Sequence, residues 1–236
     1  MTATSTQTAP TEDVSTLPAT VRWSRALRAL SRVVADPEQT DQVLVFSTYV
    51  NAGTTAHRMH RFFDDPRGQR LYQEHRTIDS HTVDLDALAA LPEGTLGHAY
   101  AQFLRSRGFT PEVFDEPPHD VADPRAQYVI QRVRQTHDLW HVVTGCDTDP
   151  AGEIALQAFT FAQIHAPSTL ILALVGTLRG VRERPSLPRE VAAAFRTGRH
   201  AEKLLAFAWE DHWATPLAEV RAMLGLPEQP RARAAA

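Results

Sequence analysis

The sequence predicts an all-α fold, in which one bundle-like helical domain holds a metal site between the two helices of a helical hairpin. Apolar side chains recur at helical spacing along most of the chain. Asp-Pro at 123–124 and 149–150 and Thr-Pro at 215–216 are helix-opening signals, in which a capping side chain precedes a first-turn proline. A chain of 236 residues, 43% of them hydrophobic, can bury one substantial core, and we place this domain at residues 21–227.

Both ends of the chain are expected to be loose. Residues 1–20 are rich in Thr, Ser and Ala and have no apolar run, so we predict a disordered N-terminal tail. They lack the charged start and apolar centre of a secretory signal, and they lack the arginines of a mitochondrial presequence. Residues 228–236 are predicted to form a flexible C-terminal tail.

The elements before residue 124 are predicted to be short and medium helices. A helix over 21–34 would place Leu27, Leu30, Val33 and Val34 on one face. Residues 40–50 open with Thr40 as a candidate cap, although their Val-Leu-Val-Phe run is also compatible with a strand. Further helices are predicted at 54–63, 67–75, 85–91 and 96–105. Three prolines and five acidic residues in 111–123 predict a long surface loop.

The second half of the chain gives clearer boundaries. A helix is predicted from the Asp-Pro pair at 123–124 to a stop at Gly145, and another begins at Pro150. Residues 169–178 form the most apolar predicted helix, which is too short for a bilayer span of about 20 apolar residues. Two closing helices are predicted at 201–213 and 216–224.

The run His137-Asp-Leu-Trp-His141, followed after eleven residues by Glu153, is the candidate functional motif. Side chains four residues apart on a helix lie roughly 6 Å apart on one face, close enough to share an ion. Helical zinc sites use two histidines at this spacing, with Glu where Asp138 stands here. Two histidines and a carboxylate from another element also form the facial triad of non-haem iron. The pattern therefore predicts a metal site.

The helical register supports this interpretation. The apolar stripe through Ile130 and Val133 continues to His137 and then His141, so both histidines are predicted to face inward. At 100° per residue, Asp138 lies about 100° from His137, and it is either a third ligand or the group that orients an imidazole. A short turn after Gly145 would fold the next helix back antiparallel and bring Glu153 towards His141.

The alternative without a metal is two buried histidines satisfied by hydrogen bonds, with Asp138 and Glu153 as surface charges. The inward register and the capped position of Glu153 favour the metal. Cys146, the single cysteine, lies in the turn and is either a thiolate ligand or a small turn residue. One cysteine excludes an intramolecular disulfide and suits a reducing compartment. A net charge of -4 gives no broad basic surface for nucleic acid.

Beyond the motif, the chain resembles the coenzyme Q (ubiquinone) biosynthesis protein 4 family, whose hallmark is His-Asp-x-x-His, eleven residues, then Glu. The resemblance runs from about Arg58 to Pro227. Its other parts are Asp84-Leu85-Asp86, the Leu-Pro-Glu-Gly-Thr-Leu-Gly block at 91–97, Tyr100, Phe103-Leu104, 128–132, Gly152-Glu153, Ala158-Phe159, Gly198-Arg199, and Trp209-Glu210 to Leu224-Gly225. One departure is His165, where the family often has Gly; it would alter the local turn and place an extra imidazole near the site.

The resemblance implies a metal-dependent decarboxylase that acts on the prenylated 4-hydroxybenzoate-derived precursor of ubiquinone and puts a hydroxyl where the ring carboxylate was. The implied ligands are His137, His141 and Glu153 on a divalent ion, zinc first, with iron or magnesium as alternatives. Asp138 would be a further ligand or a proton-handling group. Residues 169–178 are then either ordinary core or a wall for the isoprenoid tail.

The resemblance also implies partners. We expect a protein in the cytoplasm, peripheral to the inner face of the membrane, that acts with other quinone-biosynthesis proteins and is compatible with a homo-oligomer. Arg132 and Arg134 would either attract the anionic head of the substrate to the rim of the site or be solvated surface residues.

Three other functions stay open from the sequence. An HD-type metal-dependent phosphohydrolase would need another upstream histidine and a distant aspartate, for which His81 and Asp211 are available. A prenyl-lipid-binding scaffold would use the metal only structurally. A related enzyme of secondary metabolism would act on a different aromatic compound.

Overall fold

The computed structural model describes residues 13–36, 39–116, 118 and 121–228, which contain helices and no strand. The α-helices are α1 (Ala19–Ala35), α2 (Thr40–Asn51), α3 (Thr55–Phe63), α4 (Pro66–Gln73), α5 (Leu85–Ala89), α6 (Leu96–Arg107), α7 (Pro124–Thr144), α8 (Pro150–Ile164), α9 (Pro167–Gly180), α10 (Leu187–His200) and α11 (Leu217–Met223). Short 3-10 helices are η1 (Val14–Thr16), η2 (Ala52–Thr54), η3 (Pro111–Phe114), η4 (Leu204–Ala206) and η5 (Trp209–Asp211). The all-α prediction is confirmed.

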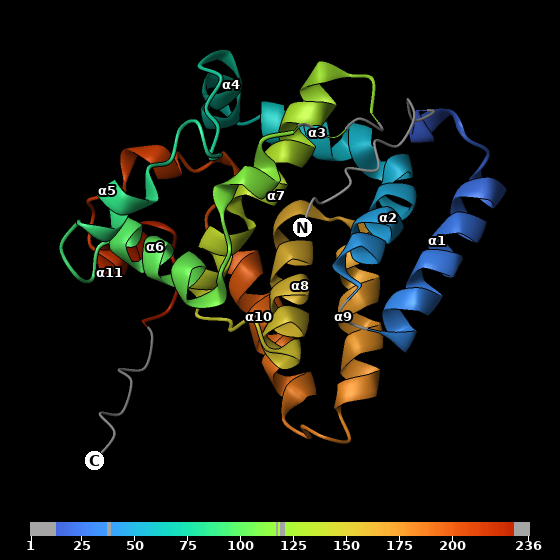
Figure 1. The fold of residues 1–236 in the computed structure, drawn as a ribbon. Helices are drawn as coiled ribbons and strands as arrows, with labels where there is room; N and C mark the ends of the chain where they lie inside the picture. The colour runs from blue at the N-terminus through green and yellow to red at the C-terminus, as the bar shows by residue number, and fades with distance from the viewer. Residues whose placement is uncertain (1–12, 37–38, 117, 119–120, 229–236) are drawn as a thin grey trace, which may run out of the picture.

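The helices form a row with α7 and α8 near its centre (Figure 1). On one side, α8 packs against α9 and α10, α9 packs against α2, and α2 packs against α1. Helix α1 therefore lies at the outer edge of the molecule (Figure 1). On the other side, α5, α6 and α11 gather around α7.

Two groups of buried apolar side chains stabilise this arrangement. The larger one surrounds α7 and includes Leu139, Trp140 and Leu156, each exposed by no more than 1%. A smaller one joins α1 to α2, where Phe46 packs over small alanines. Burying each large apolar side chain stabilises the fold by about 1.5–3 kcal/mol, so the site on α7 sits on the best-packed part of the chain.

The two helices that carry the motif begin and end where the sequence predicts. The Asp123 carboxylate accepts a hydrogen bond from the main-chain N–H of Arg125, and Asp149 accepts one from Gly152. Gly145 ends α7 with φ +75°, a left-handed conformation that glycine adopts without steric cost. The two helices meet at this turn, and α8 packs mainly along α9 and α10.

Several boundaries differ from the predictions. The N-terminal tail was predicted to reach residue 20, but Val14 is only 5% exposed and α1 begins at Ala19. Residues 1–12 and 229–236 of the predicted tails lie outside the described residues. Leu27, which we placed on one apolar face with Leu30, Val33 and Val34, is 59% exposed, because the alanines at 26 and 29 are the residues of α1 that pack against α2. The 40–50 segment is the helix α2, and the predicted loop at 111–123 opens with η3.

After α9, one predicted helix is wrong and one observed helix was not predicted. The predicted helix at 201–213 is instead two 3-10 turns, η4 and η5, joined by extended residues. Main-chain carbonyls in this stretch accept hydrogen bonds from the buried Arg132 rather than from a following helical turn. We did not predict α10 from the sequence, although this helix packs closely against α8.

Candidate metal centre

His141 is the most fixed member of the predicted site. Its side chain is fully buried, and its Nδ1 lies 2.9 Å from the main-chain carbonyl oxygen of Cys146. A carbonyl can only accept, so Nδ1 carries the proton and Nε2 presents a bare lone pair. This Nε2 has no hydrogen-bond partner among the described residues, yet it lies 3.2 Å from Oε1 of Glu153.

Two acceptors therefore face each other. A lone pair and a carboxylate oxygen at 3.2 Å repel unless a positive charge lies between them. That charge is either a proton on the imidazole or a metal ion. The capping of α8 produces this approach, because Asp149 and Pro150 start the helix just before Glu153.

His137 completes the group one helical turn earlier. Its ring centroid lies 4.8 Å from that of His141, and its side chain is 35% exposed. Burial alone lowers the pKa of His137, but the hydrogen bond that its ring donates to the Asp138 carboxylate, together with the charges of Glu153 and Asp138, raises it above its usual value. One ligand atom from each of His137, His141 and Glu153 lies within 4.8 Å of the others.

Asp138 stands beside this group rather than in it. Its Oδ1 lies 3.5 Å from Nδ1 of His137, which matches the orienting role more closely than the ligand role. The fully buried Tyr100 of α6 interacts electrostatically with the same carboxylate, because burial and then the charge of Asp138 raise the pKa of Tyr100 above its usual range. The Tyr100 hydroxyl is buried and has no hydrogen-bond partner among the described residues.

Helix α6 also supports His141 from one side. The Phe103 ring stacks on the His141 ring at 5.5 Å with an interplanar angle of 26°. The Arg107 guanidinium lies 4.0 Å from the centre of the Phe103 ring and pairs with the Asp147 carboxylate at 2.6 Å. These contacts hold the turn between α7 and α8, which sets the distance from His141 to Glu153.

Gly152 lets the first turn of α8 close against that turn. A Cβ at this position would lie 2.1 Å from the main-chain oxygen of Asp147, far inside van der Waals contact. Any side chain there would push α8 away and carry Glu153 with it. From the sequence, we named Gly152, Tyr100 and Phe103 only as parts of the family resemblance and predicted no part for them in the metal site.

Similarity to known proteins identifies the family of this chain. Residues 15–230 match the family described as coenzyme Q (ubiquinone) biosynthesis protein Coq4. The chain belongs to this family. The predicted resemblance from Arg58 to Pro227 is confirmed, and the match extends further towards the N-terminus.

Individual relatives cover most of this Coq4 family member. The ubiquinone biosynthesis protein COQ4 of Laccaria bicolor, named as mitochondrial, is 33% identical over 96% of this chain and 80% of its own length. The COQ4 homologue of Rattus norvegicus, also named as mitochondrial, is 31% identical over 87% of this chain and 78% of its own. A solved structure from Nostoc punctiforme, described as a candidate ubiquinone biosynthesis protein, is 32% identical with a TM-score of 0.70, covering 86% of this chain and 97% of that one.

An apolar groove of about 580 Å³ lies between α9 and α10, with α8 as its floor. Its walls include Leu170, Leu174, Val191 and Phe195, and Phe161 of the floor stacks on Phe195 at 6.2 Å. Leu174 is 60% exposed, although α9 is the most apolar predicted helix. Of the two predicted roles of 169–178, ordinary core accounts for only part of the helix: one face contacts α2 and α8, and the other lines this groove.

Three other predictions about site residues need correction. Arg132 is neither at the rim nor at the surface, because its buried guanidinium pairs with Glu210 at 2.7 Å. His165 ends α8 twelve residues after Glu153, about 18 Å along the helix axis, so it adds no imidazole to the site. The Cys146 thiol is outside the group of ligand atoms, burial raises its pKa, and its contribution is its main-chain carbonyl.

The residues that an HD-type phosphohydrolase would need lie elsewhere. His81 is exposed and is not among the three converging residues. The Asp211 carboxylate is paired with Arg70 and Arg76 at 3.5 and 3.0 Å. Within the described residues, the structure does not bring either side chain into the group of His137, His141 and Glu153.

No helix among the described residues is both long enough and apolar enough to cross a bilayer.

Proposed function

We propose that this Coq4 family member binds one divalent metal ion through His137, His141 and Glu153 and uses it to remove the ring carboxylate of a prenylated 4-hydroxybenzoate-derived precursor of ubiquinone. The observation that carries the metal is the buried His141 Nε2, which has no hydrogen-bond partner among the described residues and faces a carboxylate oxygen at 3.2 Å. Two imidazoles and one carboxylate suit zinc, with iron as the alternative, better than magnesium, which prefers oxygen ligands.

The donor set is open on one side. His137 and Glu153 have side chains that are 35% and 39% exposed, whereas that of His141 is fully buried. A catalytic metal site keeps positions free for substrate, and three protein ligands leave such positions. A divalent cation there would supply positive charge beside the substrate's carboxylate or phenolate.

The surrounding side chains have roles that follow from their positions. Asp138 accepts a hydrogen bond from Nδ1 of His137 and would accept the proton of the substrate's phenol hydroxyl. Phe103 and the Cys146 carbonyl keep the His141 ring from turning away. The carbon–carbon bond to the carboxylate breaks and its electron pair stays on the ring.

Putting a hydroxyl in place of the carboxylate removes two electrons from the ring. With dioxygen as the acceptor, the overall balance is carboxylated phenol, dioxygen and water giving hydroquinone, carbon dioxide and hydrogen peroxide. The prenyl tail would lie in the groove between α9 and α10, where Leu174 and Phe195 give continuous apolar surface. We further propose that the protein works at the cytoplasmic face of a membrane beside other quinone-biosynthesis proteins.

Metal content tests the first half of this proposal. The double variant His137→Ala/His141→Ala should lose the metal that elemental analysis finds in the wild type, with an affinity loss well beyond about 10-fold. The matched control is His81→Ala, which removes an exposed histidine outside the group and should retain full metal content. Full metal content in the double variant would refute the site.

Turnover tests the second half. Metal-loaded protein is given a short-chain prenylated 4-hydroxy-3-methoxybenzoate in air, and the hydroquinone is measured by mass spectrometry. Asp138→Asn keeps the shape of the residue but removes a charge, so it should keep the fold and some metal yet lose most turnover. Hydrolysis of simple phosphoesters without hydroquinone would favour a phosphohydrolase, and bound metal without either product would favour a scaffold.

A further inference from the structure

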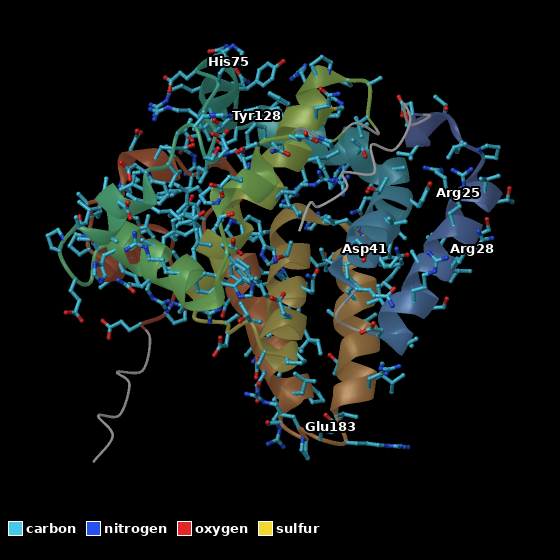
Figure 2. All side chains as sticks on the ribbon, in the orientation of Figure 1. Arg25, Arg28, Asp41, His75, Tyr128 and Glu183 are labelled. Atoms are coloured by element: carbon cyan, nitrogen blue, oxygen red, sulfur yellow. The ribbon has the colours of Figure 1, made fainter. Side chains whose placement is uncertain are left out.

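Helix α1 differs from the rest of the chain in its charge. Between Ala19 and Ala35 it carries four arginines and no acidic residue, although the chain as a whole has a net charge of -4. Arg25 donates to the hydroxyl of Tyr49, and Arg32 donates to the side-chain oxygen of Gln42, so both contact uncharged groups. Arg25 and Arg28 lie at the edge of the molecule (Figure 2).

The same helix exposes large apolar side chains. Trp23 is 49% exposed and Leu27, one turn later, is 59% exposed. They lie about 40° apart around the helix axis, and Arg28 lies about 100° further round from Leu27. The opposite face is made of alanines that pack on Phe46 of α2.

This combination indicates a lipid surface rather than a protein core. Tryptophan is enriched at the boundary between lipid head groups and acyl chains. Arg28, on the flank of this strip, would attract acidic head groups, and its long stem lets the charge stay in the head-group layer. The neighbouring helix α2 adds two exposed apolar side chains, Leu44 at 49% and Val45 at 39%.

We propose that the outer face of α1 docks on the surface of a bilayer that contains anionic phospholipids, with Trp23 and Leu27 inserted and Arg28 on the head groups. This inference rests on the membrane part of the proposed function and assigns it to one face. It is independent of the metal centre, which lies on α7 and α8 on the far side of α2 and α9.

Vesicle binding by the full-length protein tests the inference. The wild type should bind vesicles of phosphatidylcholine with phosphatidylglycerol and float with them, and should bind pure phosphatidylcholine weakly. At about 5-fold per arginine near an anionic surface, Arg28→Gln should weaken binding about 5-fold. Trp23→Ser/Leu27→Ser should weaken binding to the same vesicles by about 10-fold or more.

Control variants on α9 and α10 test whether vesicle binding depends on α1 or on any exposed arginine or leucine. Arg199→Gln removes an exposed arginine of α10, and Leu178→Ser removes a leucine of α9 that is 78% exposed. Both should bind anionic vesicles as the wild type does. Loss of binding in these variants but not in the α1 variants would overturn the proposal, and so would equal binding to both kinds of vesicle or no binding by the wild type.

Turnover separates this inference from the proposed function. The α1 variants should convert a water-soluble short-chain substrate at the wild-type rate, because α1 is outside the metal site and the groove. Failure of the wild type in that assay, with vesicle binding intact, would count against the enzyme activity alone. If the arginine variant and the Trp23→Ser/Leu27→Ser variant of α1 both show normal turnover and unchanged vesicle binding, only the proposal that α1 docks on the bilayer is refuted.

Discussion

Glu210→Gln should lower the free energy of unfolding by about 3–5 kcal/mol, the usual loss when one partner of a buried ion pair is removed. The side chain of Arg132 is 0% exposed and that of Glu210 is 12% exposed, and two nitrogen–oxygen distances of 2.7 and 3.2 Å join them. With charge centres about 4 Å apart and an effective dielectric constant of about 20, their attraction is about 4 kcal/mol. The expected loss is close to the full attraction because the Arg132 charge would stay buried, where water cannot solvate it in place of Glu210.

Urea unfolding followed by circular dichroism measures this loss. The midpoint should fall while the dependence on urea concentration stays the same, since the surface exposed on unfolding is unchanged. In thermal unfolding, a domain of this size should lose about 2–4 °C per kcal/mol. The matched control is Glu202→Gln, the same substitution in an ion pair with Arg67 whose side chains are 56% and 48% exposed; it should cost less than about 1 kcal/mol.

A double variant gives the deciding comparison. Arg132→Met/Glu210→Leu removes both charges together, so it should be more stable than Glu210→Gln, although some stability is lost because Arg132 also donates to the carbonyls of Leu205 and Phe207. Equal losses in Glu210→Gln and Glu202→Gln would refute the argument that burial makes this pair important.

Three further predictions concern single side chains, each measured by urea unfolding. His165→Gly should raise the free energy of unfolding by about 1 kcal/mol, because His165 has φ +51°, a conformation that costs L-residues about 1–2 kcal/mol; a lower value would mean that its ring contacts matter more. Asp65→Asn should lower it by about 1 kcal/mol at pH 7, because asparagine can still cap α4 but loses the negative charge that pairs with Arg67 and Lys203. The Arg67 hydrogen bond lowers the pKa of Asp65, so this contribution is full above about pH 4 and is lost as the pH falls through the folded-state pKa; a difference that persists in strong acid would contradict it. Tyr100→Phe should raise stability by about 1 kcal/mol, because the buried hydroxyl has no partner among the described residues; a loss would reveal a partner such as a bound water.

The parts of the fold that the sequence could predict are those with local causes. Asp123, Gly145 and Asp149 act on the backbone within three or four residues, and each marks a helix end as expected. The spacing of His137 and His141 likewise needs only one helix. These features depend on short-range geometry that the order of residues records directly.

The errors have long-range causes. The apolar residues of 201–213 have helical spacing. Two main-chain carbonyls of this stretch nevertheless accept hydrogen bonds from the Arg132 guanidinium, which lies 73 and 75 residues earlier in the chain. The spacing of Leu27 is that of an apolar helix face, but the neighbouring alanines make the contact with α2 and leave Leu27 exposed. The periodicity of a segment cannot show which partner its carbonyls or its apolar face will meet.

The candidate site combines both kinds of cause, and this explains its uneven burial. Local geometry puts His137 and His141 on one face, whereas the rigidity of His141 comes from Phe103 and from the Cys146 carbonyl. Glu153 depends on the turn that Arg107 holds through Asp147. One candidate ligand is thus held rigidly by its neighbours, while His137 and Glu153 stay more than a third exposed. A purely structural zinc site closes around its ion with four protein ligands, and a site with one fixed and two accessible ligands leaves room for a substrate instead.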